Sequence, residues 1–120
     1  MTRPAVTPAH QRLTEAQLQN LIFAMCGRLR LYVYHTFDSR RCARGFPDLV
    51  IIGRRVLWRE LKDWKPTSRT SREQGEVLTG LCRAGQDAGV WRPVDWFSGQ
   101  ITAQLMAIRT TEHTRRTGTR

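Results

Sequence analysis

The chain has 120 residues, of which 20 are Lys or Arg and 10 are Asp or Glu, so its formal net charge at pH 7 is +10. A chain of this length has room for about one domain, which excludes a multidomain enzyme. Hydrophobic residues make up 40% and charged residues 25%, which excludes a disordered or fibrous chain. Such a charge on a small body creates a positive field over much of its surface, so we expect a polyanionic partner, with nucleic acid favoured.

The two ends of the chain differ in composition from its middle. Residues 1–12 lack periodicity and residues 109–120 are polar and basic, so we expect both to be flexible beside a single domain of residues 13–108. The start lacks the features of a signal peptide, and the apolar runs are too short to span a membrane. The cysteines are odd in number and widely spaced, which fits neither a disulfide framework nor a zinc site. We therefore expect an intracellular protein with no membrane partner and no small-molecule substrate.

The first predicted helix begins at residue 14. Thr14 and Gln17 form a capping box, and an apolar stripe that includes Leu18 and Ile22 follows at helical spacing. Glu15 lies three residues before Leu18 and seven before Ile22, so this acid is expected on the face that packs on the core. That position is unusual for a carboxylate.

Three strands are predicted next. Residues 31–37 are rich in β-branched and aromatic side chains, and a basic, glycine-containing loop follows over residues 38–46. Residues 48–52 and 56–62 read as two further strands. The turn of residues 53–55 is short enough for these two strands to pair as a β-hairpin.

The remaining elements alternate between helix and strand. Residues 63–70 are expected to form a loop, and residues 71–88 a helix that opens with a capping box of Ser71 and Gln74 and ends before Gly89. Residues 90–94 read as an edge strand because they contain Pro93. A small last helix carries an apolar stripe of Ile101, Leu105 and Ile108, which is also our candidate dimer interface. The predicted order is αβββαβα.

The predicted hairpin places two acids side by side. Because the turn has an odd number of residues and side chains alternate along a strand, Asp48 faces Glu60, and Lys62 shares their face. Two carboxylates about 5 Å apart repel by roughly 3 kcal/mol at an effective dielectric near 20. A cation is therefore expected between them, and oxygen ligands suit Mg²⁺ or Mn²⁺.

These residues also carry a resemblance to a known family. Pro47 and Asp48, then eleven residues, then Glu60-Leu61-Lys62 resemble the PD-(D/E)xK nuclease signature. Within that superfamily the chain most resembles the VRR-NUC domain, through Glu15, the stretch RGFPDLVI of residues 44–51, Gln74, and the segment WRPVDW of residues 91–96, which is similar to the family's final strand. The resemblance implies an α/β fold with a restriction-endonuclease-like αβββαβ core, a mixed central sheet between helices, and a short C-terminal helix in addition.

The resemblance also implies roles for individual residues. Four would hold a metal ion: Glu15, Asp48, Glu60 and the main-chain carbonyl of Leu61. Lys62 would position and activate the attacking water, and Gln74 would orient Lys62. Asp48 and Glu60 thus serve both the metal and catalysis. The composition also favours this role for Lys62. Eighteen of the twenty basic residues are Arg, but the position that must relay a proton is a lysine, and Arg, with a pKa above about 12, cannot relay one.

Simpler interpretations remain for each of these residues. Glu15 is also explained as an acid favoured at a helix N-terminus, and Gln74 as a capping residue alone. Asp48 and Glu60 are also explained as solvated residues at strand ends. Among the four tryptophans, Trp64 in the loop after the catalytic strand is the candidate for stacking on a nucleobase. Six basic residues flank the site in sequence and are expected to contact phosphates: Arg40, Arg41, Arg44, Lys65, Arg69 and Arg72.

The resemblance implies a metal-dependent endonuclease acting on DNA. Stand-alone members of the family, found in phages and bacteria, are similar to Holliday-junction resolvases that work as homodimers, so branched DNA is the favoured substrate. Two nicks placed symmetrically need two centres, which a C₂ dimer supplies. One alternative is a nuclease for flaps, nicks or single strands, and another is a basic nucleic-acid-binding module without catalysis, whose affinity depends only on charge.

Overall fold

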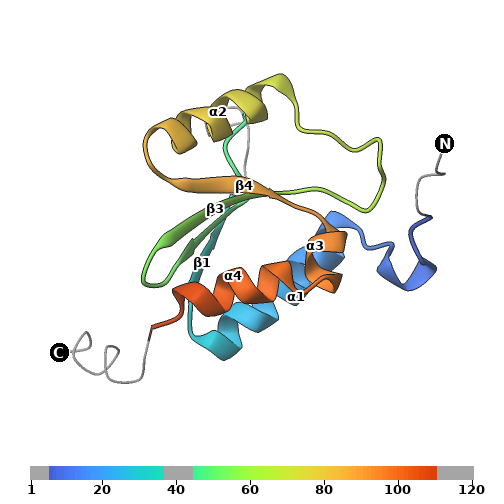
Figure 1. Ribbon diagram of the computed structural model, residues 1–120, viewed down its shortest axis with the longest axis horizontal. Coiled ribbons are helices and arrows are strands. Elements are labelled where there is room, and N and C mark those ends of the chain that lie inside the picture. The colour runs from blue at the N-terminus through green and yellow to red at the C-terminus, as the bar shows by residue number, and fades with distance from the viewer. Residues whose placement is uncertain (1–5, 37–44, 111–120) are drawn as a thin grey trace.

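The computed structural model describes residues 6–36 and 45–110, and the predicted phosphate contacts Arg40, Arg41 and Arg44 lie outside these ranges. Helices lie on both faces of one mixed sheet (Figure 1). The elements in chain order are η1 (Ala9–Gln11), α1 (Glu15–Leu29), β1 (Tyr32–His35), β2 (Leu49–Ile52), β3 (Val56–Leu61), α2 (Arg72–Arg83), β4 (Asp87–Trp91), α3 (Pro93–Phe97) and α4 (Gln100–Ile108). The predicted α/β architecture is confirmed.

The central sheet has the strand order β1-β2-β3-β4. β1 pairs with β2 and β2 with β3 in antiparallel fashion, whereas β4 lies parallel to β3. In the β2–β3 hairpin Ile52 is opposite Val56 and Val50 is opposite Trp58, as the odd-length turn predicts. A parallel pair needs a crossover between its strands, and α2 lies in that crossover.

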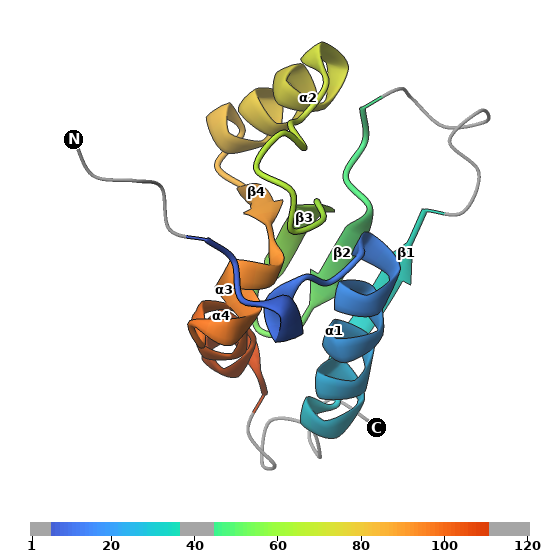
Figure 2. The same ribbon diagram turned by 90° about the vertical axis from the view of Figure 1, so that its right-hand side faces the viewer.

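The core lies between the sheet and a layer of helices on one face. Figure 2 shows α1 and α4 on the opposite side of the sheet from α2. The buried stripe of α1 carries Leu18 and Ile22, which are fully buried. Ile101, Leu105 and Ile108 of α4 are also fully buried. This stripe belongs to the chain's own core, so our expectation that it forms a dimer interface is wrong.

The second half of the chain differs from the prediction in its boundaries. α2 ends at Arg83 rather than near residue 88, because Gly85 adopts a left-handed conformation (φ +83°) and Gln86 N–H donates to the carbonyl of Leu81. β4 therefore begins three residues earlier than expected, at Asp87. It is an edge strand, as expected, because among the described strands it pairs with β3 alone. Pro93, from which the edge position was predicted, lies outside β4.

Pro93 lies at the first position of α3 and not in a strand. The ring of a proline fixes φ near the helical value, and its missing N–H is unpaired at a helix start in any case. The segment of residues 91–96 is therefore a strand only at Trp91, and its remainder bends into α3. The expectation that residues 90–94 form the final strand is corrected accordingly.

Part of the N-terminal segment has regular structure. Residues 9–11 form the 3₁₀ helix η1, and the His10 ring lies edge-on to Phe97 of α3, with ring centroids 5.8 Å apart. These three residues thus have regular structure within the segment that we expect to be flexible. Within residues 6–36 and 45–110, we find no helix long and apolar enough to cross a membrane.

One basic residue of the hairpin serves the core rather than the surface. Arg59 retains only 5% of its exposure, and its guanidinium lies 2.8 Å from Asp87 Oδ1 and over the ring of Trp91. The same group donates to Gln104 Oε1. Arg59 therefore holds β3 to β4 and α4, and its charge is not available to a polyanion.

The two described cysteines differ in their surroundings. Cys26 is buried on α1, and burial raises the pKa of its thiol to about 11, whereas Cys82 is exposed on α2. The thiolate is the reactive form of a cysteine. With a pKa of about 11, only about one Cys26 thiol in a thousand is ionised at pH 8. In a Cys42→Ser background we expect a chromogenic disulfide reagent to label Cys82 rapidly and Cys26 only after unfolding. Rapid labelling of both thiols in the folded protein would contradict this core.

Candidate active site

The β2–β3 hairpin brings Asp48 and Glu60 to one face of the sheet. Asp48 directly precedes β2, and its Oδ2 accepts a hydrogen bond of 2.8 Å from the main-chain N–H of Leu61 in β3. This bond crosses the hairpin and fixes the Asp48 carboxylate beside the end of β3. The side chain of Glu60 points to the same face because the buried residues Arg59 and Leu61 point to the other.

Glu60 is the buried member of the pair. Its residual exposure is 2%, and its Oε1 has no hydrogen-bond partner although the atom is fully buried. Burial and, to a smaller extent, the negative charge of Asp48 raise the pKa of the Glu60 carboxyl while Lys62 lowers it, and the net result is a pKa of about 8. The ionised form of Glu60 is thus disfavoured unless a further positive charge approaches.

Gln74 in the first turn of α2 links Glu60 to Lys62. Its Nε2 donates a hydrogen bond of 2.6 Å to Glu60 Oε2, and its Oε1 accepts one of 3.0 Å from Lys62 Nζ. Lys62 Nζ also lies 3.5 Å from Glu60 Oε2, and its side chain is only 12% exposed. Lys62 is therefore held in one place at the end of β3.

The same amide also caps α2. Gln74 Oε1 accepts from the N–H of Ser71 while Gln74 N–H donates to Ser71 Oγ. The capping role and the site role, which the sequence presents as alternatives, coexist in one side chain. The cap anchors the amide to the helix start, so the orientation of its oxygen and nitrogen toward Lys62 and Glu60 is fixed by three neighbours.

Glu15 borders this group from α1. It is the first residue of that helix and is exposed, so the expectation that it faces the core is wrong. Partial burial raises the pKa of its carboxyl, and the charge of Asp48 raises it further while Lys62 lowers it. Glu15 is thus within electrostatic reach of the site, at its solvent side.

The donor set fits a divalent cation. A buried carboxylate oxygen without a partner is rare in native proteins and costs free energy, and a cation at Glu60 Oε1 would remove both that cost and the repulsion from Asp48. In residues 6–36 and 45–110, no group of three or more His, Cys, Asp or Glu side chains is arranged to hold a metal. The two carboxylates would therefore need main-chain or water oxygens as further ligands, which suits Mg²⁺ or Mn²⁺.

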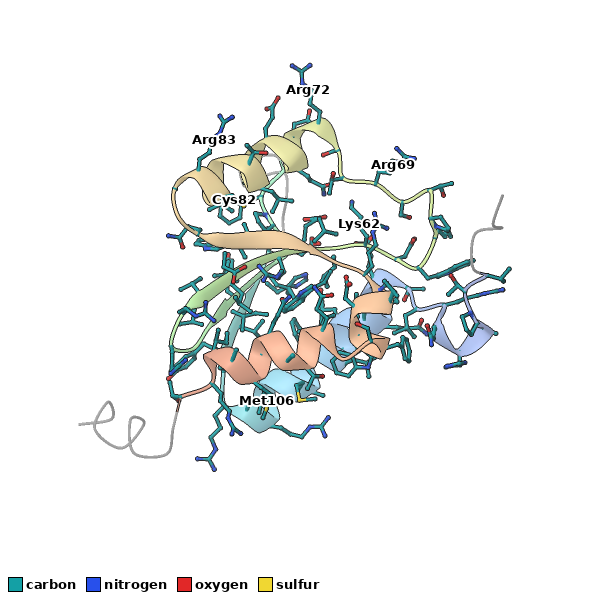
Figure 3. The ribbon with its side chains drawn as sticks, viewed as in Figure 1. Lys62, Arg69, Arg72, Cys82, Arg83 and Met106 are labelled. Atoms are coloured by element: carbon teal, nitrogen blue, oxygen red, sulfur yellow. The ribbon has the colours of Figure 1, made fainter. Side chains whose placement is uncertain are left out.

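Three of the predicted phosphate contacts are described by the structure. Lys65 and Arg69 are exposed in the loop between β3 and α2. Arg72, at the start of α2, is exposed as well, but its Nε lies 3.1 Å from Glu76 Oε1. Figure 3 shows Arg69 and Arg72 on the segment that leads into α2, with Lys62 on the neighbouring strand end. Arg72 thus shares its charge with Glu76, and Lys65 is within electrostatic reach of Asp63.

Two residues outside the predicted set support the site. Gly45, with φ +83°, is so close to α2 that a Cβ atom there would lie 2.4 Å from the main-chain carbon of Glu73. The second support is Asp63, whose Oδ1 accepts from Ser68 Oγ and from the N–H of Lys65, and the Ser68 hydrogen bond lowers the pKa of Asp63. An aspartate shortly before a proline, as Asp63 is before Pro66, is a turn signal that was available in the sequence, whereas the close approach of Gly45 was not.

Comparisons with known proteins bear on the fold. No family model matches the chain, and no curated protein matches it. A solved structure described as a "VRR_NUC domain protein" superposes with a TM-score of 0.65, at 22% sequence identity, over 80% of this chain and 90% of that one. The chain has a VRR_NUC-like fold. The resemblance stated from the residues thus holds at the level of the fold, and the roles of the site residues remain predictions.

Proposed function

We propose that this protein is a metal-dependent DNA endonuclease that cuts branched DNA, with four-way junctions as the first candidate substrate. The observation that carries the proposal is the hydrogen-bonded row of Glu60, Gln74 and Lys62 beside Asp48, with one Glu60 oxygen buried and unpartnered. The VRR_NUC-like fold and the net charge of +10 agree with a nuclease acting on DNA.

The roles of the side chains follow from this arrangement. Asp48 and Glu60 would hold Mg²⁺ or Mn²⁺, with the Leu61 carbonyl as a further ligand and Glu15 at the solvent side. When bound, such an ion supplies a water of lowered pKa and stabilises the charge on the phosphate. Lys62, oriented by Gln74, would position and activate the attacking water. Lys65 and Arg69 would hold the flanking phosphates.

A four-way junction as substrate requires a symmetric enzyme. Resolution of a four-way junction needs two symmetric nicks, and a chain with one site would act as a C₂ homodimer. The alternative within the same chemistry is a nuclease for flaps, nicks or single strands, which needs one site. The alternative of another class is a non-catalytic module in which the basic side chains supply all of the affinity.

The function is tested by cleavage of labelled DNA of three forms: a four-way junction, a flap and a linear duplex. Each is incubated with the protein in Mg²⁺, in Mn²⁺ and in EDTA, beside an Asp48→Ala variant and a Glu73→Ala variant as an exposed-acid control. We expect paired, symmetric nicks in the junction that need the metal, that disappear in Asp48→Ala and that persist in Glu73→Ala.

The other outcomes distinguish the alternatives. Metal-dependent cutting of flaps or linear strands only would keep the active site and replace the substrate. Binding that resists EDTA and Asp48→Ala, without any cutting, would replace the enzyme by the binding module. Sedimentation of the protein alone and with a junction reports on the homodimer in the same preparation.

A further inference from the structure

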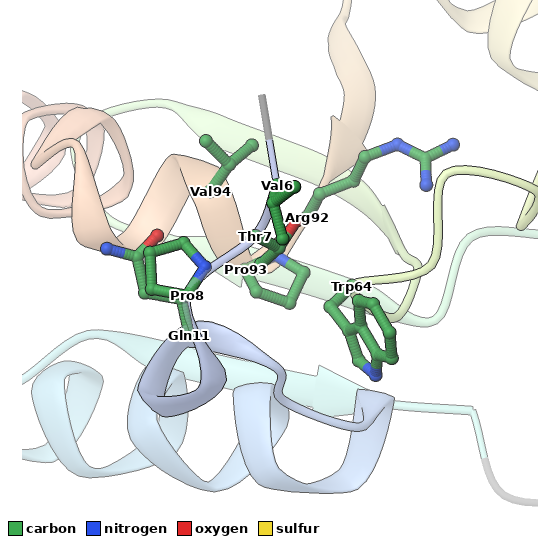
Figure 4. Close-up of a pocket in the computed structure, with 8 residues that line it drawn as sticks. All are labelled: Val6, Thr7, Pro8, Gln11, Trp64, Arg92, Pro93 and Val94. Carbon is green, nitrogen blue, oxygen red and sulfur yellow. The ribbon is translucent and has the colours of Figure 1, made fainter. Parts of the chain in front are cut away.

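A pocket lies at Trp64, two residues after Lys62 in the loop that follows β3. Three segments form it: residues 6–11 around η1, the loop after β3 at Trp64, and residues 92–94 at the start of α3. Figure 4 shows the Trp64 ring on one side of the pocket, with Pro8 and Pro93 beside it. Its volume is about 300 Å³.

The walls of this pocket are mostly apolar. Val6, Pro8, Pro93 and Val94 line it together with Trp64, and Val6 and Val94 are 80% and 60% exposed. An apolar wall does not suit a phosphate, although the protein is strongly basic. It suits the face of an aromatic ring, and the part of DNA with such a face is the nucleobase.

Trp64 is held in place as one wall of the pocket. Its main-chain N–H donates to the carbonyl of Leu13, and the guanidinium of Arg12 lies 5.0 Å from the centre of its ring. Arg12 is itself bound to the carbonyl of Thr7 through Nε. An indole fixed in this way is ready to stack on a base without further ordering, and the cations near it, Arg12 and Arg92, favour an anionic strand.

The dimensions select the kind of occupant. About 300 Å³ is at the lower end of the range of small-molecule pockets, so a ring system fits better than a helix or a strand of a protein. Trp64 follows Lys62 by two residues, which span about 7 Å at most. A base in the pocket would therefore belong to the same stretch of DNA as the phosphate that is cut.

A base in duplex DNA is paired and stacked, and is not free to enter such a pocket. We propose that this pocket binds a nucleobase near the scissile phosphate, stacked on Trp64, and so favours branched DNA in which a nucleotide at the branch is unpaired, as in a fork, or opens on binding, as at the crossing of a four-way junction. This inference rests on the proposed function for the position of the phosphate. Its binding test does not depend on cleavage.

The test uses the full chain in EDTA and two DNAs that contain the fluorescent base 2-aminopurine. In a forked duplex the probe is the first unpaired nucleotide, and in a linear duplex it is paired. Wild type is compared with Trp64→Leu, with Trp64→Phe, which keeps an aromatic face, and with Tyr32→Leu, which removes an exposed aromatic residue from the distant strand β1. Thermal unfolding of each variant is recorded.

For wild type, Trp64→Phe and Tyr32→Leu we expect the fluorescence of the fork probe to fall on binding, because stacking quenches it. In Trp64→Leu we expect no quenching and a Kd for the fork about tenfold higher, with the Kd for the duplex unchanged. An equal loss on fork and duplex would overturn the proposal, as would quenching that survives Trp64→Leu. Quenching that appears only after residues 1–5 are deleted would show that the chain's own N-terminus occupies the pocket, and would overturn it too. A Trp64-dependent fork signal without any metal-dependent cutting would instead keep the pocket and reject the nuclease.

Discussion

Replacing Lys62 by alanine is expected to lower the cleavage rate by about 10²–10⁴, the range typical of a positioned acid or base. Its Nζ is held 3.0 Å from Gln74 Oε1 and 3.5 Å from Glu60 Oε2, and the side chain is only 12% exposed. No other described lysine occupies this position. The measurement is the single-turnover rate at saturating protein with Mg²⁺, which separates the chemical step from binding.

Lys65→Ala is the matched control for this loss. Lys65 is three residues further along and exposed, so its removal should weaken DNA binding and reduce the salt dependence by about one phosphate contact. The single-turnover rate should stay near that of wild type. Lys62→Arg keeps the charge without a usable proton and is expected to be nearly as slow as Lys62→Ala. Cleavage by Lys62→Ala at a rate close to that of the control would remove Lys62 from the mechanism.

The hairpin and its acids were predictable because their signals are local. An odd-length turn and the alternation of side chains along a strand set the register that places Asp48 near Glu60. The two capping boxes, at Thr14 and Ser71, were likewise readable because each involves side chains only three residues apart. Each of these features depends on neighbours in sequence.

The features that the sequence did not reveal depend on distant parts of the chain. Whether the stripe of Ile101 and Leu105 is core or interface depends on how α4 packs on α1, and the structure buries it. Arg59 reads as a surface charge until Asp87 and Gln104 are brought beside it from 28 and 45 residues away. The early end of α2 depends on one glycine, Gly85, which adopts a left-handed conformation at a point where the sequence predicted that the helix continues.

Gly45→Ala is expected to reduce both stability and activity. A Cβ atom at this position would lie 2.4 Å from the main-chain carbon and oxygen of Glu73 and 2.7 Å from the nitrogen of Gln74, and the backbone has φ +83°. Strain at a positive φ and overpacking each cost about 1–3 kcal/mol, so we expect a loss of roughly 2–4 kcal/mol in the free energy of unfolding. Urea unfolding measures this change.

The activity should fall for a separate reason. The atoms that would clash belong to the first turn of α2, which carries Gln74, so this turn must move away and carry the amide away from Lys62 and Glu60. A misplacement of about 1 Å can cost up to about 10² in rate, and we expect a loss of roughly tenfold to a hundredfold in the single-turnover rate, measured below the unfolding transition.

Gly80→Ala is the control. Gly80 lies on the same helix, and a Cβ atom there would meet nothing within 4 Å. It should raise stability by about 0.5–1 kcal/mol and leave the rate unchanged. If Gly45→Ala behaved like this control, the contact between Gly45 and α2 would have no part in holding Gln74.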